Sequence, residues 1–120
     1  PPPPPFFFHP YAGFRYAQES RGLGDVYKRQ DYNKIVEGGI RPQVKQAMEN
    51  INNILQKHNA TMDDIVKCTC ILADGDDWGT MSEEYVRYFK NHKPARTTFG
   101  GAELGEGILV EIDCIAKLIK

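Results

Sequence analysis

Two residues of opposite charge lie in the strand-like C-terminal third of the chain, and their chemistry is complementary. Arg96 lies in the segment Pro94-Ala95-Arg96-Thr97-Thr98, and Glu111 follows Val110 in a mainly apolar stretch. A carboxylate in an apolar strand is costly to bury unless it is paired, hydrogen-bonded or used in a reaction. A guanidinium binds a carboxylate through two parallel hydrogen bonds, and a glutamate accepts a proton from water or returns one to a departing amine. The two residues are therefore candidates for binding a small carboxylate and transferring a proton.

The spacing of these two residues also allows a purely structural role. We expect residues 95–101 and 108–119 to form the two strands of a hairpin, joined by a glycine-rich turn. In this register Arg96 lies opposite Glu111 on one face. An ion pair across a hairpin contributes about 0.2–1 kcal/mol. Spacing alone favours this ion pair over an active site.

The composition argues against several classes of function. A chain of 120 residues is expected to form one domain, and a formal net charge of −1 provides no basic surface for nucleic acid. No apolar run approaches the roughly 20 residues of a membrane span, and the first residues do not resemble a secretory signal. We therefore expect a cytoplasmic protein that binds neither nucleic acid nor membrane.

Other catalytic and metal-binding patterns are not recognisable in the sequence. Cys68, Cys70 and Cys114 lie in strand-like apolar segments, and we interpret them as small buried residues that stay reduced. The spacing of the first two does not match a zinc site, and the acidic residues at 74–77 lack the ligand spacing of a calcium loop. There is no Ser-His-Asp set and no phosphate-binding glycine loop. These residue patterns do not predict a metal site.

The chain changes character near residue 31. Residues 1–30 open with five prolines and show no sustained helical or strand period. We expect this segment to be irregular, or to be a leader foreign to the domain that follows. The domain itself is expected to comprise residues 31–120.

Within this domain the pattern predicts two helices and a strand before the hairpin. Apolar residues recur at three- and four-residue spacing over 44–55, which predicts an amphipathic helix that ends near residue 58. A β-branched run at 65–73 predicts a strand. Thr80 and Glu83 match a capping box, which predicts the start of a second helix.

Alternate residues of the last predicted strand define two different faces. One face is uniformly apolar and is expected to contact the helices. It comprises Ile108, Val110, Ile112, Cys114, Ala116 and Leu118. The other face is mixed and includes Glu111, which is typical of a sheet surface that meets another subunit or a ligand pocket.

The order of several motifs resembles the RidA (YjgF-type) family of reactive intermediate imine and enamine deaminases. The resemblance covers about residues 33–118 and is carried by five short segments in sequence. These are Gly38-Gly39-Ile40, Asp64-Ile65-Val66-Lys67-Cys68-Thr69, Met81…Tyr85…Phe89, Pro94-Ala95-Arg96-Thr97 and Val110-Glu111-Ile112-Asp113-Cys114-Ile115-Ala116. The resemblance implies an α+β, chorismate-mutase-like fold, with two helices packed on one face of a mixed sheet. It also implies a homotrimer with sites in the clefts between subunits.

The same resemblance implies a 2-iminobutanoate/2-iminopropanoate deaminase. Such an enzyme hydrolyses 2-aminoacrylate-type enamines and their imine tautomers to 2-keto acids and ammonia without a cofactor. Arg96 matches the arginine that binds the substrate carboxylate, and Thr98 matches the position whose backbone N–H assists it. Glu111 matches the glutamate that activates the attacking water and shuttles protons. Two alternatives stay open, namely a non-catalytic trimer that binds small carboxylates and a ribonuclease or translation inhibitor, which the near-neutral charge disfavours.

The sequence departs from the family pattern near its N-terminus. Family members begin with two strands that carry a Gly-Pro-Tyr-Ser-like and a Ser-Gly-Gln-like stretch, and residues 1–30 contain neither. The resemblance therefore implies that the N-terminal strands are incomplete and replaced by a foreign leader. Loss of these strands would expose a sheet edge and leave one wall of the pocket open.

Overall fold

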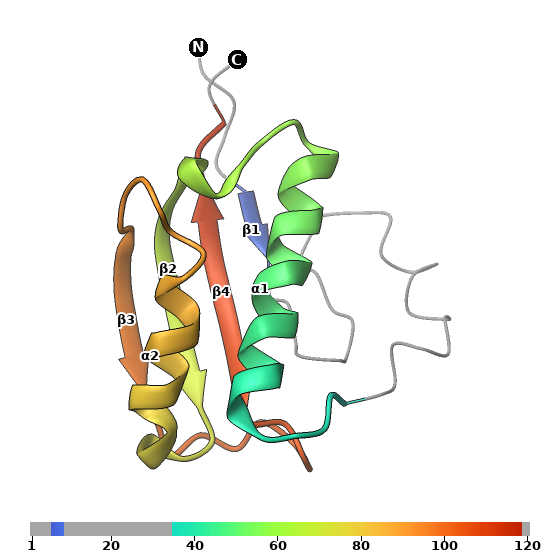
Figure 1. The fold of residues 1–120 in the computed structure, drawn as a ribbon, viewed down its shortest axis with the longest axis vertical. Coiled ribbons are helices and arrows are strands. Elements are labelled where there is room, and N and C mark those ends of the chain that lie inside the picture. The colour runs from blue at the N-terminus through green and yellow to red at the C-terminus, as the bar shows by residue number, and fades with distance from the viewer. Residues whose placement is uncertain (1–5, 9–34, 119–120) are drawn as a thin grey trace.

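Two helices lie on one face of a four-stranded sheet (Figure 1). The computed structural model describes residues 6–8 and 35–118. The helices and strands, in chain order, are β1 (Phe6–Phe8), α1 (Ile40–Lys57), β2 (Ile65–Leu72), α2 (Trp78–Val86), β3 (Ala95–Phe99) and β4 (Val110–Ala116). The predicted α+β class, with a mixed sheet and both helices on one face, is confirmed.

Helix α1 forms where the apolar spacing predicts it. Pro42 lies in the first turn, where its missing N–H costs no intrahelical hydrogen bond. The side chains that pack into the core lie on one stripe. They are Val44, Ala47, Met48, Ile51, Ile54 and Leu55. Beyond the helix, Asn59 adopts a left-handed conformation with φ of 58°, which turns the chain away from the helix axis.

Strand β2 pairs with a neighbour on each of its two edges. It is antiparallel to β4, with Cys68 opposite Cys114, and parallel to β3, with Cys68 beside Arg96. The sheet order is therefore β1-β4-β2-β3. Alternate residues of β4 are buried beneath the helices, namely Val110, Ile112, Cys114 and Ala116. The prediction that this apolar face contacts the helices is confirmed.

The predicted hairpin between β3 and β4 is wrong, because β2 lies between these two strands. Their connection crosses the end of β2 instead of turning back on itself. The N–H of Ala102 donates to the carbonyl of Leu72 at 3.1 Å, and the N–H of Ala73 donates to the carbonyl of Leu109 at 3.0 Å. Several glycines in this connection have positive φ, a property that it shares with hairpin turns. Glycine content alone could not distinguish a hairpin turn from a crossing connection.

Buried Gln43 attaches the same connection to α1. Its side-chain amide donates to the carbonyls of Val36 and Gly107 at 3.2 and 2.9 Å. Its side-chain oxygen accepts from the N–H of Leu109 at 2.8 Å. These bonds satisfy a buried polar side chain and fix the segment that leads into β4.

Helix α2 begins earlier than predicted. It starts at Trp78, directly after a 3-10 turn in which the Asp74 side chain accepts from the N–H of Asp76. Thr80 therefore lies inside the helix, and the predicted capping box of Thr80 and Glu83 is wrong. The Asp74 side chain caps this 3-10 turn, which leads directly into α2, so the helix starts closer to the N-terminus than predicted.

Strand β1 pairs antiparallel with β4, with Phe7 opposite Ile115. This short strand is an exception to the expected irregular structure of residues 1–30. The other residues of that segment, together with the expected boundary at residue 31, lie outside the described residues. The division of the chain into a leader and a domain therefore stays a prediction.

The close approach of Gly100 to Gly75 provides a test of how the segments that follow β3 and β2 pack against each other. A Cβ at Gly100 would lie 2.7 Å from the Cα of Gly75, so Gly100→Ala forces the backbone apart. We expect the free energy of unfolding to fall by about 1–3 kcal/mol, measured by urea denaturation. Gly79→Ala is the control, because no described atom lies within 4 Å of its added Cβ and the helix gains about 0.5–1 kcal/mol. Equal stability of the two variants would contradict the β2–β3 arrangement.

Candidate functional site

Arg96 lies in the outermost strand, β3, and contacts helix α2. Its pairing partner Cys68 is fully buried on the side of the sheet that the helices cover. The guanidinium carbon lies 5.1 Å from the centroid of the Tyr85 ring, which belongs to α2. A cation over an aromatic face gains about 0.5–2 kcal/mol. The ring of Tyr85 therefore helps to hold the guanidinium in place.

Thr98 lies two residues farther along β3 and shares the face of Arg96. It pairs with buried Cys70. The hydroxyl oxygen of Thr98 is buried and has no hydrogen-bond partner among the residues that the structure describes. The structure thus brings the two predicted substrate-binding residues to one face of one strand.

Glu111 lies on the opposite face of the sheet. Its pairing partner in β2 is Ile71, whereas the pairing partner of Arg96 in β2 is Cys68. Successive residues of a strand alternate between faces, so the pairing places the carboxylate on the side away from the helices. The predicted position of Arg96 directly opposite Glu111 is wrong, and so is the cross-strand ion pair that depended on it. The catalytic role of Glu111 stays a prediction.

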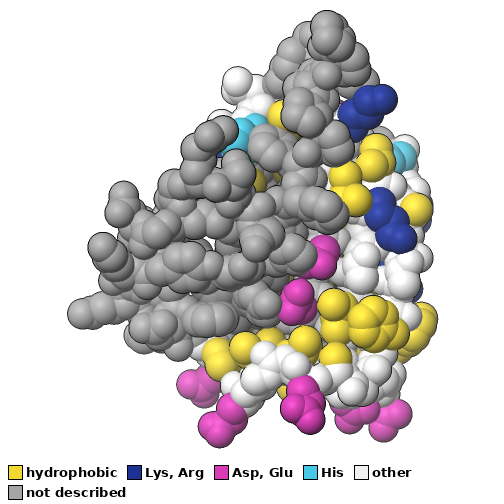
Figure 2. Space-filling view, turned by 180° about the vertical axis from the view of Figure 1, so that it is seen from behind, with side chains coloured by type: hydrophobic (Ala, Val, Ile, Leu, Met, Phe, Trp, Pro, Cys, Tyr) yellow, Lys and Arg dark blue, Asp and Glu magenta, His cyan; other side chains and the backbone are white. Residues whose placement is uncertain are grey.

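The face that carries Glu111 is not covered by α1 or α2 (Figure 1). Seen from this side, hydrophobic side chains form a band beside acidic ones, with lysine or arginine side chains farther up (Figure 2). Glu111, Asp113 and Ile115 are half-buried, and Val66 and Phe99 are about half exposed, at 50% and 48%. The face combines apolar area with acidic groups.

Three free thiols lie in the core close to Arg96. The sulfur atoms of Cys68 and Cys114 are 2.7 Å apart. The hydrogen bond with Cys114 lowers the pKa of Cys68, whereas burial and the same bond raise the pKa of Cys114. Burial, followed by the proximity of Cys68, raises the pKa of Cys70 to about 12. The interpretation of all three residues as small buried side chains is confirmed.

Tyr85 belongs to one of the motifs shared with the family, and no role in the site was predicted for it. The residue is buried, and its ring also contacts Arg96. Burial and the neighbouring thiols raise the pKa of Tyr85, so the hydroxyl stays protonated at neutral pH. The contact arises because α2 packs over β3. The spacing of residues in the sequence could not predict this position of the helix.

The described residues provide no evident metal site. No group of three or more His, Cys, Asp or Glu side chains in this part of the chain is arranged to hold an ion. None of the described helices combines the length and apolar character needed to cross a bilayer.

Comparison with known protein sequences identifies one family. A family model described as endoribonuclease L-PSP matches residues 23–118. Protein HMF1 of Saccharomyces cerevisiae is 38% identical over 84 residues, which cover 70% of this chain and 65% of that protein. The 2-iminobutanoate/2-iminopropanoate deaminase of Rattus norvegicus is 39% identical over 83 residues, which cover 69% of this chain and 61% of the rat protein. The matched part is thus less than two thirds of the length of either relative.

Comparison with solved structures gives the same fold. RidA from the Antarctic bacterium Psychrobacter sp. PAMC 21119 superposes with a TM-score of 0.66 at 30% identity. The superposition covers 71% of this chain and 68% of that structure. The chorismate-mutase-like fold that the motifs imply is therefore confirmed.

The buried thiols lead to a prediction about their reactivity. A thiol reacts as its thiolate, and the raised pKa values of Cys70 and Cys114 keep these two groups protonated. The pKa of Cys68 is lowered, but all three thiols are fully buried and therefore inaccessible to a reagent. We expect no rapid reaction of the native protein with an aromatic disulfide reagent at pH 8. In concentrated guanidinium chloride all three cysteines should react. Rapid modification of any thiol in the native protein would contradict the arrangement of this core.

Proposed function

The chain belongs to the RidA (YjgF-type) family, and on this premise we propose that it hydrolyses 2-aminoacrylate-type enamines and their imine tautomers. The products are 2-keto acids and ammonia. The observation that carries the proposal is the occurrence of Arg96, Thr98 and Glu111 at the matching motif positions, on strands of the same fold. The name of the rat relative, a 2-iminobutanoate/2-iminopropanoate deaminase, supports this substrate class.

In the proposed reaction Arg96 binds the substrate carboxylate through its two parallel N–H groups, and the backbone N–H of Thr98 donates a further hydrogen bond. The protonated imine carbon is already electrophilic. Glu111 orients a water molecule, accepts its proton as the C–O bond forms, and returns a proton to the nitrogen. The C–N bond of the resulting carbinolamine then breaks, releasing ammonia and leaving the keto acid. Positioning and one proton shuttle suffice for this reaction, so we propose no metal or cofactor.

The two faces of the sheet constrain how such a site is assembled. Arg96 lies on the side of the sheet that the helices cover and Glu111 on the opposite side, with β2 between their strands. We therefore propose that Arg96 of one subunit works with Glu111 of another subunit of a homotrimer. The half-exposed apolar side chains of Val66 and Phe99 support packing of a second copy near the face that carries Glu111. Like the trimer, a cytoplasmic location is part of the proposal.

A second candidate is suggested by the family description, which names an endoribonuclease. A net charge of −1 provides little attraction for RNA, so we place this activity behind the deaminase. A third candidate is a trimer that binds small carboxylates without turnover. It would be supported by thermal stabilisation with 2-ketobutyrate in the absence of ammonia release.

Two substitutions test the assigned chemistry. Glu111→Gln removes the proton acceptor and is expected to lower kcat about 10²- to 10⁴-fold. Arg96→Ala removes the carboxylate anchor and is expected to raise KM about 10- to 100-fold, because hydrogen bonds to charged groups contribute about 1.5–3 kcal/mol. Ammonia release from enzymatically generated 2-aminoacrylate is the measurement. Lys57→Gln, at the far end of α1, is the control for loss of a surface charge. Ammonia release at the uncatalysed rate by the unmodified chain would refute the deaminase.

Mixed assembly tests whether the site is shared between subunits. Equal amounts of Arg96→Ala and Glu111→Gln chains are unfolded together and refolded. If the two residues act from different subunits, about a quarter of the interfaces regain both of them and ammonia release returns in proportion. If both residues act from the same chain, every site still lacks one of them and activity stays at the level of the separate variants.

A further inference from the structure

A cavity of about 670 Å³ lies between the first turns of α1 and the end of α2, apart from the residues assigned to deamination. Its lining combines four basic residues, one acid, one proline and one aromatic ring. These residues are Arg41, Pro42, Lys45, Glu84, Arg87, Tyr88 and Lys90. The volume is within the range of pockets that hold small organic ligands. This cationic lining contrasts with a chain whose net charge is −1.

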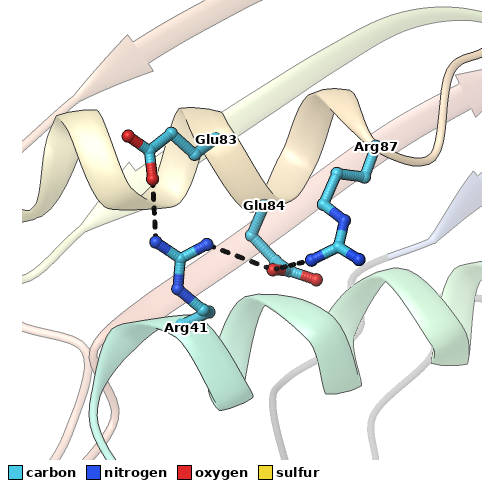
Figure 3. Close-up of polar contacts among 4 residues, drawn as sticks. All are labelled: Arg41, Glu83, Glu84 and Arg87. Carbon is cyan, nitrogen blue, oxygen red and sulfur yellow. Dashed lines mark hydrogen bonds and ion pairs between the residues drawn. The ribbon is translucent and has the colours of Figure 1, made fainter.

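The two arginines are held by a buried glutamate (Figure 3). Arg41 extends from α1 to α2, where its Nη atoms lie 2.8 Å from Glu83 and 3.4 Å from Glu84. Arg87 approaches the same oxygen of Glu84 at 3.3 Å. The side chain of Glu84 is only 5% exposed, whereas those of Arg41 and Arg87 are 47% and 68% exposed. The acid is therefore covered, and much of each arginine side chain stays accessible to a ligand.

The two lysines of the cavity are available for an anion. Lys45 and Lys90 are exposed, and the structure gives them no ion pair or hydrogen bond with any described residue. Lysine ammonium groups act as point charges for phosphate, and arginine adds parallel donors. Arg41 and Arg87 are already paired with glutamates, so Lys45 and Lys90 are the cations that need an anionic partner, and a single carboxylate would match only one of them. The lining favours a ligand with several negative charges close together.

Tyr88 adds an aromatic surface to the basic lining. Its ring is half-buried. Partial burial, together with the negative charges of Glu49 and Glu84, raises the pKa of Tyr88, so its hydroxyl stays a donor at neutral pH. Aromatic side chains in such positions stack against flat rings of ligands.

We propose that the cavity between α1 and α2 binds a nucleoside diphosphate, with its phosphates among the four basic side chains and its base against Tyr88. The negative charge of Glu84 does not oppose this, because Arg41 and Arg87 already lie against that carboxylate. Glu83 is 70% exposed, so water and salt screen its charge. The two helices that form the cavity do not contain Arg96 or Glu111.

Calorimetric titration of the full chain with ADP and with inorganic pyrophosphate tests this proposal. We expect saturable binding of both probes, with ADP tighter because only ADP has a base to stack on Tyr88. The double variant Lys45→Gln, Lys90→Gln should weaken both probes about tenfold or more. Tyr88→Leu should weaken ADP toward the affinity of pyrophosphate and leave pyrophosphate unchanged.

The control is a lysine that lies outside the cavity. Lys57→Gln removes the same charge at the other end of α1 and should leave both affinities unchanged. Equal weakening by Lys57→Gln would mean that only the general charge of the surface attracts anions, and it would overturn the proposal. So would the absence of saturable binding at millimolar ADP. Unchanged thermal unfolding of the exposed lysine variants checks that any loss of binding is local.

Discussion

Hydrogen bonding of β2 on both of its edges is the interaction on which the rest of the structure depends. Its antiparallel partner β4 and its parallel partner β3 are both distant in sequence. Parallel neighbours require a connection that crosses from one end of the sheet to the other, and here α2 makes that crossing. The crossing places α2 beside α1 on one face, where the two helices bury the same core. Arg96 and Tyr85 come together because of this topology.

Patterns among residues near in sequence predicted the helices and strands well. They could not predict which strands pair with each other. The apolar stripe of α1 and the β-branched run of β2 depend on residues near in sequence, and both formed as expected. The hairpin failed because it assumed that neighbouring strands pair, whereas β2 is inserted between β3 and β4. The capping box at Thr80 failed for a smaller reason, since an earlier acidic turn already initiates the helix.

In the candidate site, too, the residues were predictable from the sequence but their arrangement in space was not. Arg96, Thr98 and Glu111 were identified from the order of motifs, and alternation along a strand correctly placed Glu111 on the face away from the helices. The position of Arg96 relative to Glu111 depends on the sheet order. Because β2 lies between their strands, the two charges lie on opposite faces of the sheet and not opposite each other on one face. Tyr85 and the Arg41–Glu84–Arg87 cluster were missed because each joins segments distant in sequence. Such contacts follow from the packing of helices, which a single sequence does not display.

The interior position of β4 has a consequence for how the chain acquires its structure during synthesis. This strand is the last described element in the sequence, yet it lies between β1 and β2 and supplies much of the buried surface. The buried face of α1 therefore has no complete sheet to pack on until the ribosome has released residues 110–116. Until then, the apolar stripe of α1 and the thiols of β2 are open to solvent and to chaperones. The core formed by the described residues is therefore complete only after β4 has entered between β1 and β2.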